Sequence, residues 1–468
     1  MSDISGSTLL RDVTVITVDQ RRRIILNGFI LVQDGRITHV SSKPPDKLPE
    51  DVRIMSLPGR IVIPGLINSH AHLAQSLLRG LAEDLPLHSW LCDRIWPLEA
   101  AYRGEGDAAD GYVAARLTIG EMLLSGTTCF LEAMLTHGSG FANVARAVSE
   151  MGIRACLVSR PKCLHQLITS MLSTRLTNDD DKGKLVKFVE TNPALGIADA
   201  RDKDPDHMSI PSLLAAHSEF HGTSNDRIHV WAACGTPRGA PLSSFAEAGK
   251  ACQQHDIGIT MHCAEAPRDL SIFRDVYGDR TPMQFCRDAG LTGPKTVLAH
   301  MCHPRHGYRP GHPEGIADHG GAQPDEQPQA RVGHRRGGPD AQSGGAHEAL
   351  EMATIRGAKA LGLETEIGSL GVGKKADLVV LDVRASWAAP WSPEMFPRGG
   401  MDPVSLVVGS CTGRDVTHVM VDGRMLVEDG RLLVADESAI VQSARQAVAG
   451  IQERSGVRAS WKAGWEYE

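Results

Sequence analysis

The segment DAADGYVAARLTIGEMLLSGTTCFLEAMLTHGSGFANVARAVSEMGIRACL, residues 107–157, decides the fold. Apolar residues recur at helical spacing over residues 107–125 and 141–151, and a glycine follows each run as a typical helix-ending residue. Short β-rich apolar runs lie at residues 127–131 and 153–157. The segment therefore predicts the order helix, strand, helix, strand, which is typical of an α/β domain.

The same alternation extends to both sides of this segment. Further strands are predicted at residues 61–66, 228–233, 257–262 and 296–300, and further helices at residues 243–254 and 346–361. Repeated strand–helix units over roughly 250 residues favour a (β/α)8 barrel over an open doubly wound sheet. In such a barrel the polar residues that follow the strands lie together on one face, where catalytic groups are found.

Both ends of the chain are rich in strand and hairpin signals. Apolar β-rich runs fill the first sixty residues and return between residues 376 and 427. Asp-Gly pairs at residues 34–35, 422–423 and 429–430 are typical of tight turns between strands. We therefore predict one small β domain that both termini build, with two unrelated β caps as the alternative.

The composition excludes several classes of protein. The chain has 468 residues, of which 42% are hydrophobic and 22% charged, so it is neither disordered throughout nor collagen-like. A net charge of −7 without basic runs argues against nucleic acid or an anionic membrane as a partner. We expect no membrane-spanning helix, because no apolar run reaches about 18 residues, and no secretory signal. Ten cysteines without close paired spacing predict reduced thiols and a cytoplasmic location.

Two histidines lie just after the strand predicted at residues 61–66. His70 and His72 alternate along an extended segment, so their side chains point to the same side and could face one metal ion. A lone His-x-His pattern is weak evidence for a metal site. Two loop histidines in solvent are the alternative interpretation.

Three further polar residues lie at the ends of later strands. His262 ends the strand at residues 257–262 and Glu265 follows it, while His300 ends the strand at residues 296–300. Each alone is better explained as a packed core or rim residue, but their shared placement at strand ends points to a barrel active site. Three histidines suit a zinc-type ion that keeps one position open for water. A nearby carboxylate can then move protons between that water and a leaving group.

Four motifs carry a resemblance to a known family. They are PGLINSHAH (residues 64–72), LPLHSWL (85–91), IWPLE (95–99) and SGTT (125–128). Together they resemble the amidohydrolase superfamily, and within it the branch of methylthioadenosine/S-adenosylhomocysteine deaminases, with the triazine hydrolases as relatives. The resemblance covers most of residues 1–300 and 346–435.

The resemblance implies a distorted TIM (β/α)8 barrel with a β-sandwich built from both termini. It also implies one divalent metal ion, zinc or iron, held by His70, His72 and His262. Glu265 would then shuttle protons and touch a ring nitrogen of the substrate, and His300 would orient or polarise the attacking water. The implied reaction is hydrolysis of a carbon–nitrogen bond in a cyclic amidine, in which ammonia or an amine leaves and a carbonyl remains.

The resemblance also implies a heterocyclic small-molecule substrate, purine-like or triazine-like, and a possible homodimer. Trp90 and Glu99 match positions that hold the ribose in the nucleoside deaminases, and Arg227 resembles a substrate-side arginine. A packed aromatic and a solvated helix charge are the alternatives for Trp90 and Glu99. The motif GTPRG (residues 235–239) departs from the branch's usual GPHSP, which leaves the nucleoside substrate open.

Two segments depart from the family pattern. The family completes its site with an aspartate in a Gly-Thr-Asp motif on the last barrel strand, and the sequence lacks that motif. In its place, residues 303–345 contain ten glycines and six prolines, which predicts disorder or a stretch read in a shifted frame. Residues 158–182 form a polar segment that we interpret as an insert, either a retained intron or a genuine surface insertion.

These observations define the predicted domains and the competing functions. Residues 1–60 and 366–436 form the β-sandwich, residues 61–365 the barrel, and residues 437–468 a C-terminal helix and tail. The alternative to an active hydrolase is a catalytically impaired pseudoenzyme, or a defective gene model, that lacks the metal-binding aspartate. A two-metal hydantoinase-type enzyme is disfavoured, because we find no bridging lysine at a mid-barrel strand end.

Overall fold

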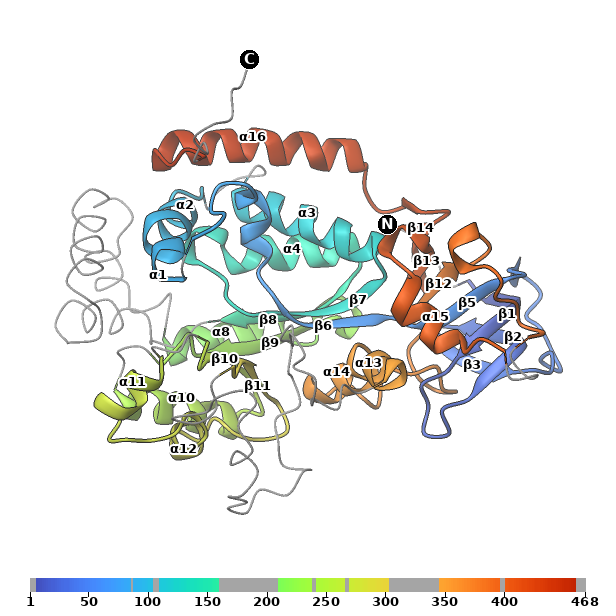
Figure 1. The fold of residues 1–468 in the computed structure, drawn as a ribbon, viewed down its shortest axis with the longest axis horizontal. Helices are drawn as coiled ribbons and strands as arrows, with labels where there is room; N and C mark the ends of the chain where they lie inside the picture. The colour runs from blue at the N-terminus through green and yellow to red at the C-terminus, as the bar shows by residue number, and fades with distance from the viewer. Residues whose placement is uncertain are drawn as a thin grey trace.

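The computed structural model describes residues 6–85, 87–103, 109–159, 209–237, 241–265, 269–302, 345–395 and 400–459. Figure 1 shows two sheets joined side by side, a parallel sheet in the middle of the chain and a mixed sheet formed by the two ends. The parallel sheet carries the candidate site. The mixed sheet packs against its N-terminal edge.

The parallel sheet has six strands whose spatial order follows the chain. They are β6 (Leu66–Ala71), β7 (Thr127–Glu132), β8 (Arg154–Ser159), β9 (Ile228–Ala233), β10 (Ile259–Cys263) and β11 (Thr296–His300). All five neighbouring pairs are parallel. Most residues of β7 to β11 are buried, because helices cover the outside of the sheet, whereas burial alternates along β6. The predicted α/β barrel is confirmed in the residues that the structure describes.

Helices connect and cover these strands. They are α3 (Asp110–Leu124), α4 (Phe141–Met151), α8 (Ile210–Phe220), α9 (Thr223–Asp226), α10 (Leu242–Gln254), α11 (Asp269–Asp275) and α12 (Pro282–Asp288). In Figure 1, α3 and α4 lie on one side of the strands, and α10 and α12 lie on the other. The helix predicted at residues 141–151 matches α4, which ends because Gly152 adopts the left-handed conformation with φ 80°.

A second group of short helices lies along the chain between β6 and α3. It consists of η1 (Leu73–Leu78), α1 (Leu87–Ser89), η2 (Trp90–Ile95), a π-helix, and α2 (Trp96–Ala100). The long C-terminal helix α16 (Glu437–Ser455) crosses over α3 in Figure 1. The Arg454 side chain anchors α16 by donating to the carbonyl of Ala101, at 2.7 Å, and to the carboxylate of Asp110.

Both ends of the chain build the mixed sheet, as the hairpin signals predict. Its nine strands are β1 (Thr8–Ile16), β2 (Ile24–Gln33), β3 (Arg36–Ser41), β4 (Arg53–Ser56), β5 (Arg60–Pro64), β12 (Leu378–Asp382), β13 (Val416–Val421), β14 (Arg424–Glu428) and β15 (Arg431–Leu432). The two halves meet where β5 pairs with β12, with Ile63 opposite Val379. All three Asp-Gly pairs have positive φ at both residues, which tight hairpin turns require.

A buried ion pair joins the two sheets. Arg154, at the start of β8, donates two hydrogen bonds of 3.0 and 3.1 Å to the carboxylate of Asp377, which precedes β12. The same carboxylate accepts the backbone N–H of Asp422 at 2.8 Å. Both charged side chains are at most 2% exposed. This buried and fully paired contact joins the barrel to the mixed sheet at the N-terminal ends of the barrel strands.

The structure differs from the sequence prediction in the closing helix. Residues 346–361 form two helices, α13 (Ala346–Met352) and α14 (Ile355–Ala360), instead of one. They are separated at Thr354, which is fully buried, has φ −132° and ψ −98°, and donates its hydroxyl to the carbonyl of Leu350 at 2.5 Å. Hydroxyl groups compete with the helical backbone for hydrogen bonds, which favours such a break. The chain then forms α15 (Pro403–Ser410) and two short 3-10 helices, η7 (Ser386–Ala388) and η9 (Gly413–Asp415).

Most of the two unusual segments lies outside the described residues. Of residues 303–345 only Gly345 is described, so the predictions of disorder and of a shifted reading frame concern residues outside the structure's described ranges. Of residues 158–182, Val158 and Ser159 belong to β8, and the others are likewise outside those ranges. In the part of the chain that is described, no helix is both long and apolar enough to cross a membrane.

Candidate metal centre

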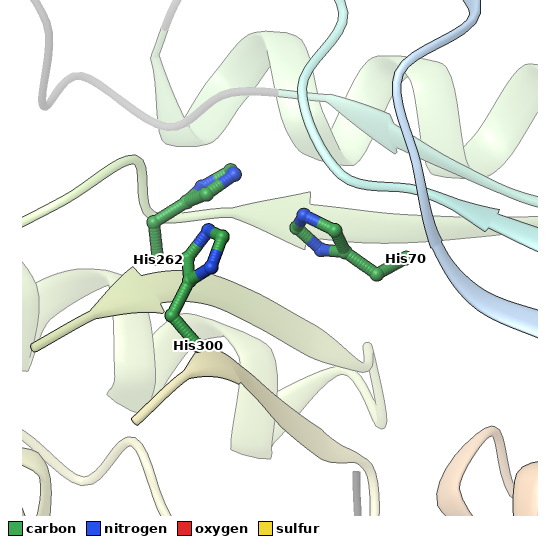
Figure 2. A group of neighbouring side chains, drawn as sticks. All are labelled: His70, His262 and His300. Carbon is green, nitrogen blue, oxygen red and sulfur yellow. The ribbon is translucent and has the colours of Figure 1, made fainter. Parts of the chain in front are cut away.

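Three histidines from three parallel strands converge at the C-terminal ends of β6, β10 and β11. His70 lies on β6, His262 on β10, and His300 is the last residue of β11. Figure 2 shows their rings pointing toward one another. Because parallel strands end at the same edge of the sheet, residues far apart in the sequence meet here.

The spacing of these rings suits a shared metal ion. Each histidine offers one ring nitrogen, and the three nitrogens all lie within 4.8 Å of one another. The ring centroid of His70 is 4.9 Å from that of His262 and 5.4 Å from that of His300. A first-row metal ion holds its imidazole nitrogens at about 2.0–2.1 Å, so ligand nitrogens around it are separated by a few ångströms.

His72 completes the group. It follows β6, directly before η1, and its Nε2 is 3.1 Å from Nε2 of His262. Two ligand nitrogens of a tetrahedral ion lie about 3.3 Å apart, given metal–nitrogen bonds of about 2.0–2.1 Å. The separation of His72 and His262 therefore fits two ligands of one ion, as well as a hydrogen bond between two neutral rings.

The electrostatic state of His70 favours metal binding. Its Nδ1 is buried and has no hydrogen-bond partner among the described residues, which is costly for a polar atom unless a ligand occupies it. Burial, with a smaller contribution from the charge of His300, lowers the pKa of His70 from 6.5 to about 4. The ring is therefore neutral at pH 7, and neutral imidazole is the form that binds metal. The residues present fit a divalent ion.

Glu265 lies next to the histidines. It follows β10 after Ala264, whose φ of 50° turns the chain sharply at the end of the strand. The Oε1 atom of Glu265 is 3.6 Å from Nε2 of His300. The backbone of His300 also has a positive φ, of 69°. Positive φ is rare for residues other than glycine and concentrates at functional sites, where surrounding contacts hold the strained backbone. A carboxylate at this position can exchange protons with a group bound between it and the histidines.

The two predicted ribose contacts, Glu99 and Trp90, lie in the short helices that follow β6. Glu99 on α2 is only 8% exposed, and its Oε1 accepts a hydrogen bond of 3.3 Å from Nε2 of Gln75. Gln75 lies on η1, three residues after His72, so Glu99 is linked directly to the segment that carries a predicted ligand. Trp90 begins η2 and is half-buried against an apolar cluster that includes Leu77.

The structure does not bring Arg227 to this group. Arg227 precedes β9, so it lies at the N-terminal end of the barrel strands, whereas the histidines lie at or beyond the C-terminal ends. Its guanidinium is buried and donates to the carbonyl of Ile153 at 3.2 Å. Burial and the nearby charge of Arg424 lower the pKa of Arg227 to about 10. This arginine packs where the barrel meets the mixed sheet, which gives it a structural setting.

Two buried carboxylates beside the site were not singled out from the sequence. Glu132 ends β7 and is fully buried, and its carboxylate accepts the backbone N–H groups of Leu73 and Met134 at 2.8 and 3.0 Å. Asp269 begins α11 and accepts the backbone N–H of Glu265 at 2.9 Å. Glu132 could have been found from the sequence, because it is a charged residue directly after the strand predicted at residues 127–131.

Comparison with known proteins supports one family. The model of the amidohydrolase family matches residues 61–318 and 332–426. A 5′-deoxyadenosine deaminase of Methanosarcina acetivorans is 30% identical over 97% of this chain and 100% of its own length. A 5-methylthioadenosine/S-adenosylhomocysteine deaminase of Desulforamulus reducens is 27% identical over 95% of this chain and 98% of its own length. These relatives confirm the branch that the motifs predict.

A solved structure agrees with this fold. The crystal structure of an adenosine deaminase from Xanthomonas campestris with bound zinc has a TM-score of 0.70 and 22% sequence identity, and the match covers 96% of this chain and 99% of that one. At this identity the likeness concerns the fold. Together with the family match over most of the sequence, it leads to one conclusion: the chain belongs to the amidohydrolase family, hydrolases of carbon–nitrogen bonds other than peptide bonds.

Proposed function

We propose that this chain is a hydrolytic deaminase that acts on an adenosine-type ring with the help of one divalent metal ion, zinc in the first instance. The observation that carries this proposal is the meeting of four histidines with Glu265 at one end of the barrel. The names of the two relatives, both deaminases of adenosine derivatives, favour the purine-like over the triazine-like ring. The zinc in the Xanthomonas campestris structure favours zinc over iron.

The proposed roles follow from the placement of each side chain. His70, His72 and His262 would hold the ion, and His300 would orient the attacking water from the end of β11. Such an ion, when bound, lowers the pKa of its water to about 7, so hydroxide is available at neutral pH. Glu265, at 3.6 Å from His300, takes the proton from the water and delivers it to the leaving nitrogen. In this proposal one carboxylate serves both proton transfers.

The substrate side of the proposal concerns the short helices after β6. Glu99 would accept hydrogen bonds from ribose hydroxyls, since a carboxylate is an acceptor for two such donors. Trp90 would pack its ring against the substrate from the start of η2. Both residues lie in the short helices after β6. Gln75, three residues after His72, donates a hydrogen bond to Glu99 and so connects these helices to the histidine.

The direct test measures bound metal and released ammonia. Purified protein is incubated with 5′-deoxyadenosine-type, guanine-type and triazine substrates, and ammonia and bound zinc or iron are quantified per chain. Stoichiometric metal with ammonia release from the adenosine derivative supports the proposal. Turnover of the triazine alone would replace the purine assignment, and absence of both metal and turnover would favour the catalytically impaired form.

That impaired form was predicted from the missing aspartate of residues 303–345, which lie outside the described ranges apart from Gly345. No relative named above favours it. We further propose a cytoplasmic enzyme, because ten cysteines without close paired spacing predict reduced thiols, as expected in a reducing compartment. The predicted homodimer is tested by sedimentation equilibrium.

Replacing Glu265 with glutamine is expected to lower kcat by about 10²–10⁴-fold, because the amide cannot accept and return a proton. Bound metal per chain should stay at the wild-type value, since Glu265 is not among the proposed ligands. Steady-state ammonia release and metal analysis measure the two quantities. The matched control is Glu453→Gln on the exposed side of α16, which should leave both unchanged. A wild-type kcat in Glu265→Gln would contradict the proton-transfer role.

Replacing Glu99 with glutamine is expected to raise KM for the nucleoside by about 10–100-fold, the loss typical of a hydrogen bond to a charged group. Turnover of the free base, which lacks the ribose, should change much less. Kinetics with adenosine and with adenine compare the two. An equal loss for both substrates would contradict a ribose contact and would instead indicate that Glu99 supports Gln75 and the fold.

A further inference from the structure

We propose that Glu132 is a positioning residue that fixes His72 for metal binding through the backbone on its C-terminal side. This inference rests on the proposed metal site. Glu132 is the last residue of β7, and its Cα pairs with that of Ala71, the residue before His72. The carboxylate is fully buried at the face of the barrel that carries the histidines.

The end of β7 holds both peptide groups that flank His72. The carbonyl of Ala71, in the preceding peptide, accepts the backbone N–H of Ala133 at 2.7 Å. The N–H of Leu73, in the following peptide, donates to Oε2 of Glu132 at 2.8 Å. With both peptide planes held, the φ and ψ of His72 are set, and the direction of its Cα–Cβ bond is set with them.

A carboxylate does this better than any neutral side chain. Oε1 of Glu132 accepts the N–H of Met134 at 3.0 Å while Oε2 accepts that of Leu73. Both oxygens are therefore engaged, and the bond to each N–H is strengthened by the negative charge in a buried setting. A glutamine could accept only one of the two N–H groups and would turn its own NH₂ toward the other.

The consequence reaches the metal site through the geometry of His72. Its Nε2 lies 3.1 Å from Nε2 of His262, a separation that suits two ligands of one ion. Metal sites depend on such supporting contacts, and their loss typically weakens metal affinity by about 10–100-fold. Glu132 thus contributes to metal affinity although it is not one of the proposed ligands.

The chain offers a matched control that acts on the same residue, Leu73. Thr118 on α3 donates its hydroxyl to the carbonyl of Leu73 at 3.2 Å, and Ser76 donates to that carbonyl at 2.9 Å. This carbonyl belongs to the next peptide and does not flank His72. Thr118→Val removes a hydrogen bond to the same residue and keeps the side-chain shape, so it measures the effect of general loosening.

The test measures metal affinity directly. Full-length wild type, Glu132→Gln, Glu132→Asp and Thr118→Val are stripped of metal and titrated with zinc against a chromophoric chelator, and with cobalt while the visible absorption is recorded. We expect Glu132→Gln to bind zinc about 10–100-fold more weakly and to show an altered cobalt spectrum, and Glu132→Asp to recover part of the affinity because both oxygens remain. Thr118→Val should stay within about threefold of wild type.

Each contrary result has a distinct meaning. Wild-type zinc affinity and cobalt spectrum in Glu132→Gln would overturn this inference and leave the proposed metal site intact. Equal weakening in Thr118→Val would overturn it too, because a general structural role would then explain both variants. Should Glu132→Gln fail to fold, Glu132→Asp with no change in zinc affinity or in its cobalt spectrum has the same consequence. A wild-type protein that binds no metal would overturn the proposed function itself, and this inference with it.

Discussion

Replacing His70 with alanine is expected to remove the bound metal ion and to lower kcat/KM by more than about 10³-fold, because the water then keeps its high pKa and hydroxide is scarce at neutral pH. The ring of His70 lies close to all three others, with the ring centroids of His72, His262 and His300 at 5.0, 4.9 and 5.4 Å. Metal content is measured per chain, and turnover is measured as released ammonia.

The control for this variant is His255→Ala, since His255 is an exposed histidine at the end of α10. It should retain metal and activity, which shows that losing one imidazole is not itself harmful. Unchanged ammonia release in His70→Ala would refute the site assignment. Loss of activity with full metal retention would assign His70 to substrate or water instead of to the ion.

Replacing Arg154 with methionine is expected to lower the free energy of unfolding by about 3–5 kcal/mol, because it leaves the carboxylate of Asp377 buried and without its cation. The pair is at most 2% exposed, so water cannot compensate. Denaturant-induced unfolding measures the loss. The effect should appear without any change in metal affinity, because this contact lies at the opposite ends of the barrel strands from the histidines.

Two further variants test the physical reason. Arg154→Met combined with Asp377→Leu should recover part of the stability, since no unpaired charge remains, although the N–H of Asp422 then loses its acceptor. Arg79→Met removes an ion pair with Glu121 whose side chains are 57% and 47% exposed, and should cost less than about 1 kcal/mol. An equal cost for Arg79→Met and Arg154→Met would show that burial is not the cause.

Much of the fold could be predicted because its signals are local. Helix α4 follows from apolar spacing and a terminal glycine, and the hairpins follow from Asp-Gly pairs that tolerate positive φ. The convergence of His262 and His300 was also predictable, since each ends a predicted strand and parallel strands end together. His70 was expected just after the strand predicted at residues 61–66, but the structure divides that stretch between β5 of the mixed sheet and β6 of the barrel, and β6 carries His70. In these cases the residues that predict each helix, turn or strand end lie within that element or a few positions from it.

Other features depend on contacts that no local pattern reveals. The closing helix breaks at Thr354 because its hydroxyl meets the carbonyl of Leu350 in a fully buried setting. Glu132 accepts the N–H of Leu73, which is 59 positions away, and the residues near Glu132 in the sequence do not predict that contact. For Arg227 the local pattern is the better guide. The strand predicted at residues 228–233 places this arginine at the N-terminal end of a barrel strand, whereas the family resemblance assigns it to the substrate side.

The joining of β5 to β12 has a consequence for the growing chain. Ile63 and Val379 are neighbours in the sheet but roughly 300 residues apart, so the ribosome completes one partner about 15–60 s after the other at about 5–20 residues per second. During that interval the edge of β5 that β12 will cover has no strand to pair with, and unpaired apolar edges recruit other chains. The nascent protein therefore spends most of its synthesis with an open sheet edge, and chaperone binding at residues 60–64 would shorten that exposure.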